Sequence, residues 1–292
     1  IYYDSVLYTF YHIHFEFFPF NFGPELPDNQ LRDDEMSVCF DSSVFFETLE
    51  LVGGPLVKLT LMTNKPLSQV AVRLCDLRPD GTSALISHGF LNLTMRKSFE
   101  FPEALVAGKK YDVLIELDQT AYSLPAGHRL RLAVSNCYWP FIWPSPEKNE
   151  LKLFSGSIDF KVRNKKSKFK EYEFEQVETG ESWNSEIKRA PELTRQDLFD
   201  ELTGANVIVI KNDFGCILDL DHFLQVDSSS EERWCIKNGD QLSATADFSW
   251  EQKFSRLDWN VSTEVKVSVS CDKSNFYIRG SITASENLES IF

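Results

Sequence analysis

The sequence lacks several features that would place the protein in a familiar class. It has no run of about 18 consecutive apolar residues, which excludes a membrane-spanning helix. Its six cysteines form no C-x-x-C pair, which removes most zinc and thioredoxin-type sites. Basic residues are outnumbered by acidic ones, 30 against 44, and the formal net charge is −14. Such a surface repels phosphate backbones, so nucleic acid is not an expected partner.

The sequence also lacks signs of a secretory or metal-binding protein. Its apolar start has neither a basic beginning nor a small-residue cleavage site. The irregularly spaced cysteines indicate reduced, buried thiols. His12 and His14 would point the same way along a strand, but no cysteine or carboxylate pattern beyond Glu16 accompanies them. We therefore expect a cytoplasmic protein with no metal site and no cofactor.

Composition and patterning predict an all-β fold. Hydrophobic residues make up 42% of the 292 residues and aromatic residues 13%, including 24 phenylalanines. Aromatic and β-branched residues favour strands. Short segments of alternating apolar and polar residues are separated by turn signals such as Pro79-Asp80-Gly81, and this spacing indicates a sandwich. In this first part, residues 49–63 are expected to form a turn around Gly53, Gly54 and Pro55 and then a strand, and further strands are expected at residues 70–74, 84–93, 110–117, 128–135 and 151–162.

A basic segment divides the chain. Residues 163–170 carry five basic side chains in eight positions without an apolar period, which is typical of a solvated linker. Alternating segments return further along, so a second antiparallel β region is expected to follow the sandwich. Within it, the spacing of Asp197, Leu198, Phe199 and Leu202 predicts a single helical turn over residues 194–202.

The most informative segment is a loop rich in aromatic residues and proline at residues 138–146. Its three prolines lack amide protons and have a fixed φ, so it forms neither a helix nor a central strand. A strand precedes it, so the loop lies at one edge of a sheet. Such loops either cap a core or line a binding surface, and both alternatives stay open. The binding candidates are Trp139, Phe141 and Trp143, as part of an interface or the wall of a substrate pocket.

Four motifs occur in a characteristic order. They are L-x-D-x-x-P-D-G-T at residues 74–82, G-x-L-N-L-T-x-R at 89–96, P-x-G-H-R-x-R at 125–131 and W-P-x-x-W-P-S-P at 139–146. Together they resemble the C-terminal non-catalytic region of the X-Pro dipeptidyl-peptidase and cocaine-esterase (CocE/NonD) family of serine hydrolases. The resemblance covers roughly residues 22 to 290. It implies that the sandwich is a jelly roll of the galactose-binding-like kind.

The resemblance also implies a domain organisation. Residues 1–21 form an atypical aromatic segment, interpreted either as an edge strand or, preferably, as a stretch carried over from a catalytic region. Residues 22–165 form the jelly-roll domain, similar to the X-Pro dipeptidyl-peptidase C-terminal domain. Residues 166–292 form the second antiparallel β region, which we interpret as truncated relative to longer members.

Family members hydrolyse esters or X-Pro peptides with a Ser-His-Asp triad on a preceding α/β-hydrolase domain. That domain is marked by a G-x-S-x-G elbow, and no such pentad occurs in this chain. None of the five histidines has a serine or cysteine in a recognisable nucleophile context. We therefore predict no catalytic residues and an accessory domain whose partner is the α/β-hydrolase catalytic domain. The alternative is an independent carbohydrate-binding module.

Two smaller expectations concern surface chemistry. An acid-base cluster could be drawn from Asp76, Asp80, His88, His128 and Arg129, but Asp80 lies in a P-D-G turn and no nucleophile accompanies the set, so a structural role is expected. Arg129 and Arg131 share one strand face and are expected to pair with Asp76 or Asp118. If the aromatic loop meets a catalytic domain, the isolated chain exposes apolar surface and is expected to self-associate.

Overall fold

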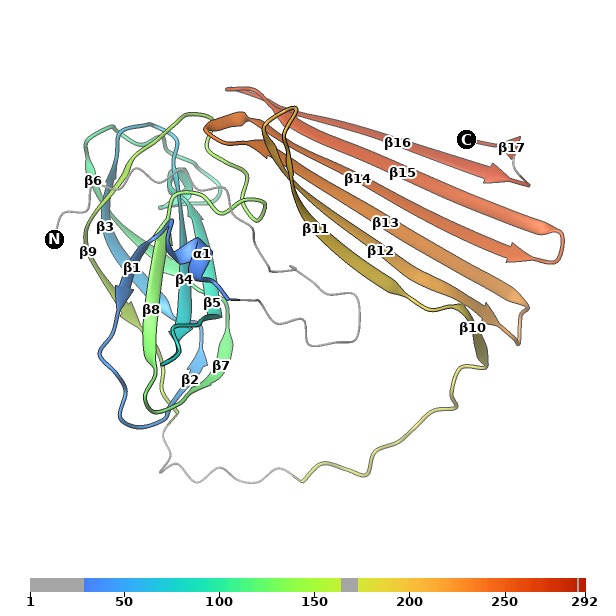
Figure 1. The fold of residues 1–292 in the computed structure, drawn as a ribbon, viewed down its shortest axis with the longest axis horizontal. Helices are drawn as coiled ribbons and strands as arrows, with labels where there is room; N and C mark the ends of the chain where they lie inside the picture. Colours follow the sequence, from blue (N-terminus) through green and yellow to red (C-terminus); the bar gives the residue numbers. More distant parts are fainter. Residues whose placement is uncertain (1–28, 164–172, 288) are drawn as a thin grey trace. The chain divides into compact units, whose positions relative to one another are not determined.

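The computed structural model describes residues 29–163, 173–287 and 289–292 (Figure 1). The predicted aromatic segment at residues 1–21 therefore lies outside the described residues. Throughout the described part, the strands pair antiparallel, which confirms the all-β fold. The chain divides into two compact units, residues 1–167 and 168–292.

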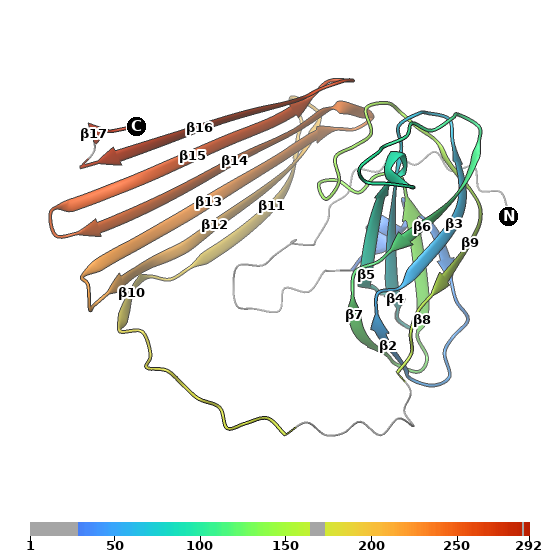
Figure 2. The same cartoon turned by 180° about the vertical axis from the view of Figure 1, so that it is seen from behind.

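The first unit consists of short strands in three small sheets (Figures 1 and 2). The strand orders are β1-β8-β4-β5, β6-β3-β9 and β2-β7. A short helix α1 (Leu31–Asp34) precedes the strands, and a 3-10 turn η1 (Leu93–Met95) follows β5. The strands are β1 (Val38–Asp41), β2 (Leu49–Gly53), β3 (Leu56–Thr63), β4 (Gln69–Leu77), β5 (Ser83–Asn92), β6 (Lys110–Glu116), β7 (Thr120–Leu124), β8 (Arg129–Ser135) and β9 (Leu151–Asp159).

The core of this unit is built by strands that bury alternate residues. In β3, Val57, Leu59 and Leu61 are buried while Lys58 between them is exposed, as a strand with one face on a core requires. Side chains from β4, β6, β8 and β9 join the same cluster. Strand β4 lies between β8 and β5 and is buried on both faces. The jelly-roll topology itself stays a prediction.

Two of the sequence motifs have a local structural explanation. In the P-D-G turn, the Asp80 carboxylate accepts a hydrogen bond from the Thr82 amide at 2.9 Å, as expected for this turn chemistry. In the L-N-L-T motif, Asn92 caps η1, because its side-chain oxygen accepts from the Thr94 amide at 3.1 Å. A Cβ at Gly89 would lie 2.6 Å from the Glu116 carbonyl oxygen. Close backbone approach therefore requires glycine at that position.

The second unit is one sheet of long strands joined in sequence order, shown in yellow to red in Figures 1 and 2. The order is β10-β12-β13-β14-β15-β16-β17, with β11 also paired to β12. The predicted helical turn over residues 194–202 is wrong. Residues 192–200 instead form a strand whose nine residues all pair with β12. The strands are β10 (Ser185–Arg189), β11 (Glu192–Asp200), β12 (Ala205–Asp219), β13 (Leu224–Lys237), β14 (Asp240–Arg256), β15 (Trp259–Cys271), β16 (Phe276–Glu286) and β17 (Glu289–Ser290).

Candidate functional site

The aromatic loop follows β8 and folds against the first unit. Trp139 is only 2% exposed and meets Trp143 edge-on, with ring centroids 5.1 Å apart. Phe141 lies in a separate cluster, edge-on to His88 at 5.4 Å and 5.7 Å from Tyr138. Phe141 and Trp143 are half-buried. The structure therefore brings two of the three candidate rings together and leaves accessible surface mainly on Phe141 and Trp143.

Polar contacts fix the path of this loop. The Gln69 side-chain amide on β4 donates to the Trp143 carbonyl at 3.0 Å. Within the loop, the Ile142 amide donates to the Tyr138 carbonyl at 2.9 Å. At its start, the Ser135 hydroxyl donates to the Cys137 carbonyl at 2.8 Å. Because the prolines have no amide protons to donate, these bonds give the backbone carbonyls of the loop their hydrogen-bond partners. The aromatic rings are therefore held on a stiff segment.

A buried charge cluster lies beneath α1 beside the same loop. The Arg73 guanidinium on β4 is 3.0 Å from Asp34 Oδ1 and 3.8 Å from Asp33 Oδ2. It also donates to the Gln30 side-chain oxygen at 3.1 Å and lies over the Tyr138 ring, 5.5 Å from its centroid. Sequence reasoning missed this cluster. The available signal was Arg73 itself, a charge that interrupts the apolar run V-A-V-R-L-C and therefore needs a buried partner.

Arg131 on β8 joins this cluster from the adjacent strand. It forms two hydrogen bonds with the Asp41 carboxylate, at 2.7 and 2.8 Å, and a third with Asp34 at 3.1 Å. The expected pairing of Arg131 with Asp76 or Asp118 is therefore wrong. Asp41 and Arg131 are directly opposite in the β1–β8 ladder, which places them on one face. The guanidinium of Arg131 lowers the pKa of Asp41 through these hydrogen bonds.

Within this cluster, burial changes the pKa of the Asp33 carboxyl most clearly. Desolvation raises the pKa of its carboxyl from 3.8 to about 7, against the opposing attraction of Arg73. The folded chain therefore holds a proton that the unfolded chain releases between about pH 4 and pH 7. Because the folded state binds more protons in that window, this group's contribution to stability falls as the pH rises through it.

We expect Asp33→Asn to remove this dependence. The wild-type free energy of unfolding should lose up to about 1.4 kcal/mol per pH unit from this group between the two pKa values. The neutral amide should show no such loss, so the stability of the variant relative to wild type rises from pH 5 to pH 8. Urea titrations across that range measure the slope, with the exposed Glu100→Gln as the control. Parallel wild-type and Asp33→Asn profiles would contradict the assignment.

The histidines and carboxylates named in the sequence form two separate pairs. His128 Nδ1 lies 2.8 Å from Asp76 Oδ1, and the Tyr122 hydroxyl donates to the other oxygen of that carboxylate at 2.8 Å. His88 lies 3.3 Å from Asp118, and burial lowers its pKa. Among the described residues, the His128 side chain hydrogen-bonds no serine or cysteine. In the described ranges, the arrangement thus orients the His128 imidazole without hydrogen-bonding it to a nucleophile.

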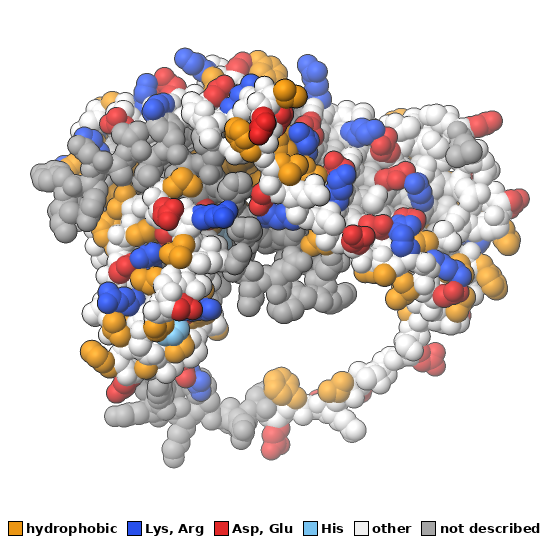
Figure 3. All heavy atoms as spheres, viewed as in Figure 1, with side chains coloured by type: hydrophobic (Ala, Val, Ile, Leu, Met, Phe, Trp, Pro, Cys, Tyr) orange, Lys and Arg blue, Asp and Glu red, His pale blue; other side chains and the backbone are white. Residues whose placement is uncertain are grey.

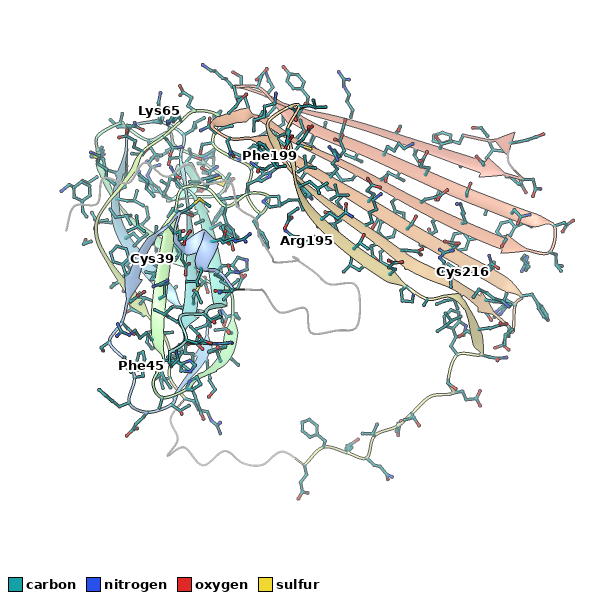
Figure 4. The ribbon with its side chains drawn as sticks, viewed as in Figure 1. Cys39, Phe45, Lys65, Arg195, Phe199 and Cys216 are labelled. Atoms are coloured by element: carbon teal, nitrogen blue, oxygen red, sulfur yellow. The ribbon has the colours of Figure 1, made fainter. Side chains whose placement is uncertain are left out.

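An apolar hollow of about 450 Å³ opens between the β1 and β9 edges of the first unit. Its lining includes Phe40, Leu132, Phe154 and Phe160, together with Phe45 in the loop after β1 (Figure 4). Asp41 also borders it, but that carboxylate is already bonded to Arg131. The hollow can therefore accept an apolar group, and it offers little charge with which to orient a substrate.

Within the described ranges, no group of three or more His, Cys, Asp or Glu side chains could hold a metal ion. All six cysteines are free thiols, and burial raises the pKa of Cys39 and Cys137 to about 11 and of Cys75 to about 12. None of the helices in the part of the chain that the structure describes is long and apolar enough to cross a membrane.

Comparison with known proteins gives matches in sequence. A family model described as the X-Pro dipeptidyl-peptidase C-terminal non-catalytic domain matches residues 4–172. Cocaine esterase from Rhodococcus sp. (strain MB1 Bresler) is 24% identical over 123 residues, covering 41% of this chain and 21% of the esterase. Xaa-Pro dipeptidyl-peptidase from Lactobacillus delbrueckii subsp. lactis is 28% identical over 132 residues, covering 34% and 17%. The chain thus spans about a fifth of the length of these relatives.

Comparison with solved structures gives partial matches. An aminopeptidase from a Thaumarchaeota archaeon of marine sediment matches with a TM-score of 0.46 and 18% identity, covering 49% of this chain and 28% of that one. An α-amino acid ester hydrolase matches with a TM-score of 0.45 and 20% identity, covering 47% and 27%.

Proposed function

The chain belongs to the X-Pro dipeptidyl-peptidase C-terminal non-catalytic domain family, and from this we propose that it serves as the accessory β region of a serine hydrolase. This membership confirms the resemblance carried by the four motifs between residues 74 and 146. The observation that carries the proposal is the family match over residues 4–172 in a chain without a G-x-S-x-G elbow. The catalytic partner in this proposal is an α/β-hydrolase domain.

The aromatic loop supports a specific contact surface in this proposal. Phe141 and Trp143 keep accessible apolar surface on a segment whose path is fixed by Gln69 and by the loop's own hydrogen bonds. A stiff loop loses little conformational entropy on docking. We propose that these two rings contact the catalytic domain or wall its substrate pocket, while Trp139 supports Trp143 from beneath. Cleavage of esters or of X-Pro peptides by the parent enzyme belongs to the same proposal.

The alternative of an independent carbohydrate-binding module receives little support from the geometry. A sugar platform needs aromatic rings that present their faces to solvent beside polar groups. Trp139 is buried, and its ring meets Trp143 at an interplanar angle of 80°. The two rings therefore do not form a flat platform. The accessory role remains the function that the geometry supports best.

The six free thiols favour a reducing compartment, because disulfides form and persist in oxidising compartments. The cysteines lie in both units, for example Cys39 on β1 and Cys216 on β12 (Figure 4). A cytoplasmic location is part of our proposal on this basis.

The purified chain is expected to hydrolyse neither p-nitrophenyl acetate nor an X-Pro p-nitroanilide. His128 is oriented by Asp76 but hydrogen-bonds no serine or cysteine of the described part of the chain, so we expect no acyl-enzyme to form there. A serine-directed fluorophosphonate probe should label no residue, as read by intact mass. Stoichiometric labelling of one serine would contradict the accessory role.

In the source genome, the reading frame preceding the codon for Ile1 should encode G-x-S-x-G, and a frame without it would contradict the proposed partner.

A further inference from the structure

The sheet of the second unit has two chemically different faces. Directly paired residues of antiparallel strands lie on the same face, and neighbours along a strand alternate between faces. Trp250 on β14 pairs with Val265 on β15, which pairs with Ile282 on β16. One position away, Glu251 pairs with Glu264, which pairs with Thr283. Across β14, β15 and β16, the first set belongs to an apolar face and the second to a polar face.

The polar face is adapted to water. Its lysines pair with glutamates, with Lys253 Nζ 2.8 Å from Glu251 and Lys266 Nζ 2.7 Å from Glu264. Figure 3 shows Lys, Arg, Asp and Glu side chains interspersed over the strands of this sheet on the face turned toward the viewer. A shallow hollow of about 360 Å³ on this sheet is bordered by charged side chains such as Arg233, Asp247 and Arg279. This face needs no cover.

The opposite, apolar face presents large side chains to solvent. Trp250 meets Phe214 with ring centroids 5.0 Å apart, so aromatic residues on β12 and β14 form one continuous surface. Toward the β16 edge, Ile278 is 70% exposed and Ile282 is 52% exposed. A single-layer sheet with one apolar face is stable in water only when another layer covers that face. Contiguous apolar patches of this extent mark interaction sites.

We propose that the face of β13 to β16 that carries Trp250, Val265 and Ile282 is the dimer interface between two copies of this chain, packed sheet against sheet. Four strands spaced about 4.8 Å apart and eleven residues long, at about 3.4 Å per residue, cover about 700 Å² on each copy. The two copies together would bury about 1,400 Å², which lies within the range of stable interfaces of about 1,200 to 2,000 Å². The area therefore suffices for a specific dimer.

The chemistry of the face favours a second sheet as the occupant. Val265, Val267 and Ile282 are short branched side chains in adjacent rungs, the kind that interdigitates between sheets stacked about 10 Å apart. Glu232 is the charged residue among its central rungs, and its carboxylate accepts a hydrogen bond from Trp234 Nε1 at 3.0 Å. A two-fold axis applies the same patch to both copies, and with Glu232 as the charged residue of its central rungs the patch brings little like charge together.

The test is sedimentation equilibrium of the full chain between about 1 and 100 μM. We expect a dimer for the wild type. Ile282→Lys should raise the dimer dissociation constant at least about 100-fold, because two-fold symmetry buries the unpaired ammonium twice. The control is Thr283→Lys, which places the same charge one position away on the polar face opposite Glu264. That variant should dimerise as the wild type does, and circular dichroism should show both variants folded.

Three outcomes would overturn the proposal. One is a dimer that both lysine variants leave unchanged, which would place the contact on another surface. Another is a monomeric wild type that does not enhance the fluorescence of an apolar dye, which would mean that the chain's own residues cover the face. The third is a monomer that co-sediments with phosphatidylcholine vesicles, which would identify lipid as the occupant.

Discussion

Replacing Arg73 with methionine is expected to cost about 3 to 5 kcal/mol of unfolding free energy in the first unit, because it removes the buried cation beside Asp33 and leaves Asp34 with Arg131 alone. The guanidinium lies 3.0 Å from Asp34 and donates to Gln30 and to the Ser37 hydroxyl, each at 3.1 Å. Methionine fills a similar volume but donates no hydrogen bond. A loss of this size is a large share of the total stability of a typical domain.

Urea denaturation followed by circular dichroism measures the cost. The matched control is Arg129→Met on β8, since Arg129 is exposed and its replacement should change the unfolding free energy by less than about 0.5 kcal/mol. Replacing the two buried carboxyl groups as well, in the triple variant Arg73→Met, Asp33→Asn, Asp34→Asn, should restore part of the loss. Equal effects of Arg73→Met and Arg129→Met would show that the cluster does not stabilise the fold.

The sequence predicted strands well where the alternation is regular. Residues 261–270 alternate valine with polar residues, and the structure places them within β15. The alternation fails at residues 194–202, where Leu198 and Phe199 are adjacent and fit either a helix or a strand. There the long ladder between β11 and β12 decides the outcome. Such pairing is a tertiary effect that local spacing does not encode.

The binding role of the aromatic loop stays a prediction, and the orientation of its rings could not be predicted from the sequence. Composition located the aromatic loop, yet which ring turns inward depends on contacts with Gln69 and His88, which lie at least 50 residues earlier in the chain. The partner of Arg131 was missed for a similar reason. Strand β1 pairs with β8 and places Asp41 opposite Arg131, and an apolar-polar pattern does not reveal which strands become neighbours.

The burial of Trp139 in this loop predicts the second large loss of unfolding free energy. Trp139→Ala is expected to lower the unfolding free energy by about 3 to 5 kcal/mol, the usual cost of removing a buried tryptophan. Trp143→Ala should cost about 1 to 2 kcal/mol, because its ring is half-buried and loses less apolar contact. Trp183→Ala is the control, since that side chain is 58% exposed and should change stability by less than about 0.5 kcal/mol.

The order of these three costs distinguishes a core role from a binding role. Urea titrations of the single variants give the free energies, and circular dichroism at zero denaturant reports which variants remain folded. If Trp139→Ala were as mild as Trp183→Ala, the Trp139 ring would not be part of the core and would return to the candidate binding surface. If Trp143→Ala were as costly as Trp139→Ala, the two edge-on rings would act as one packing unit. Phe141 would then be the remaining accessible ring with which this loop could contact a catalytic domain.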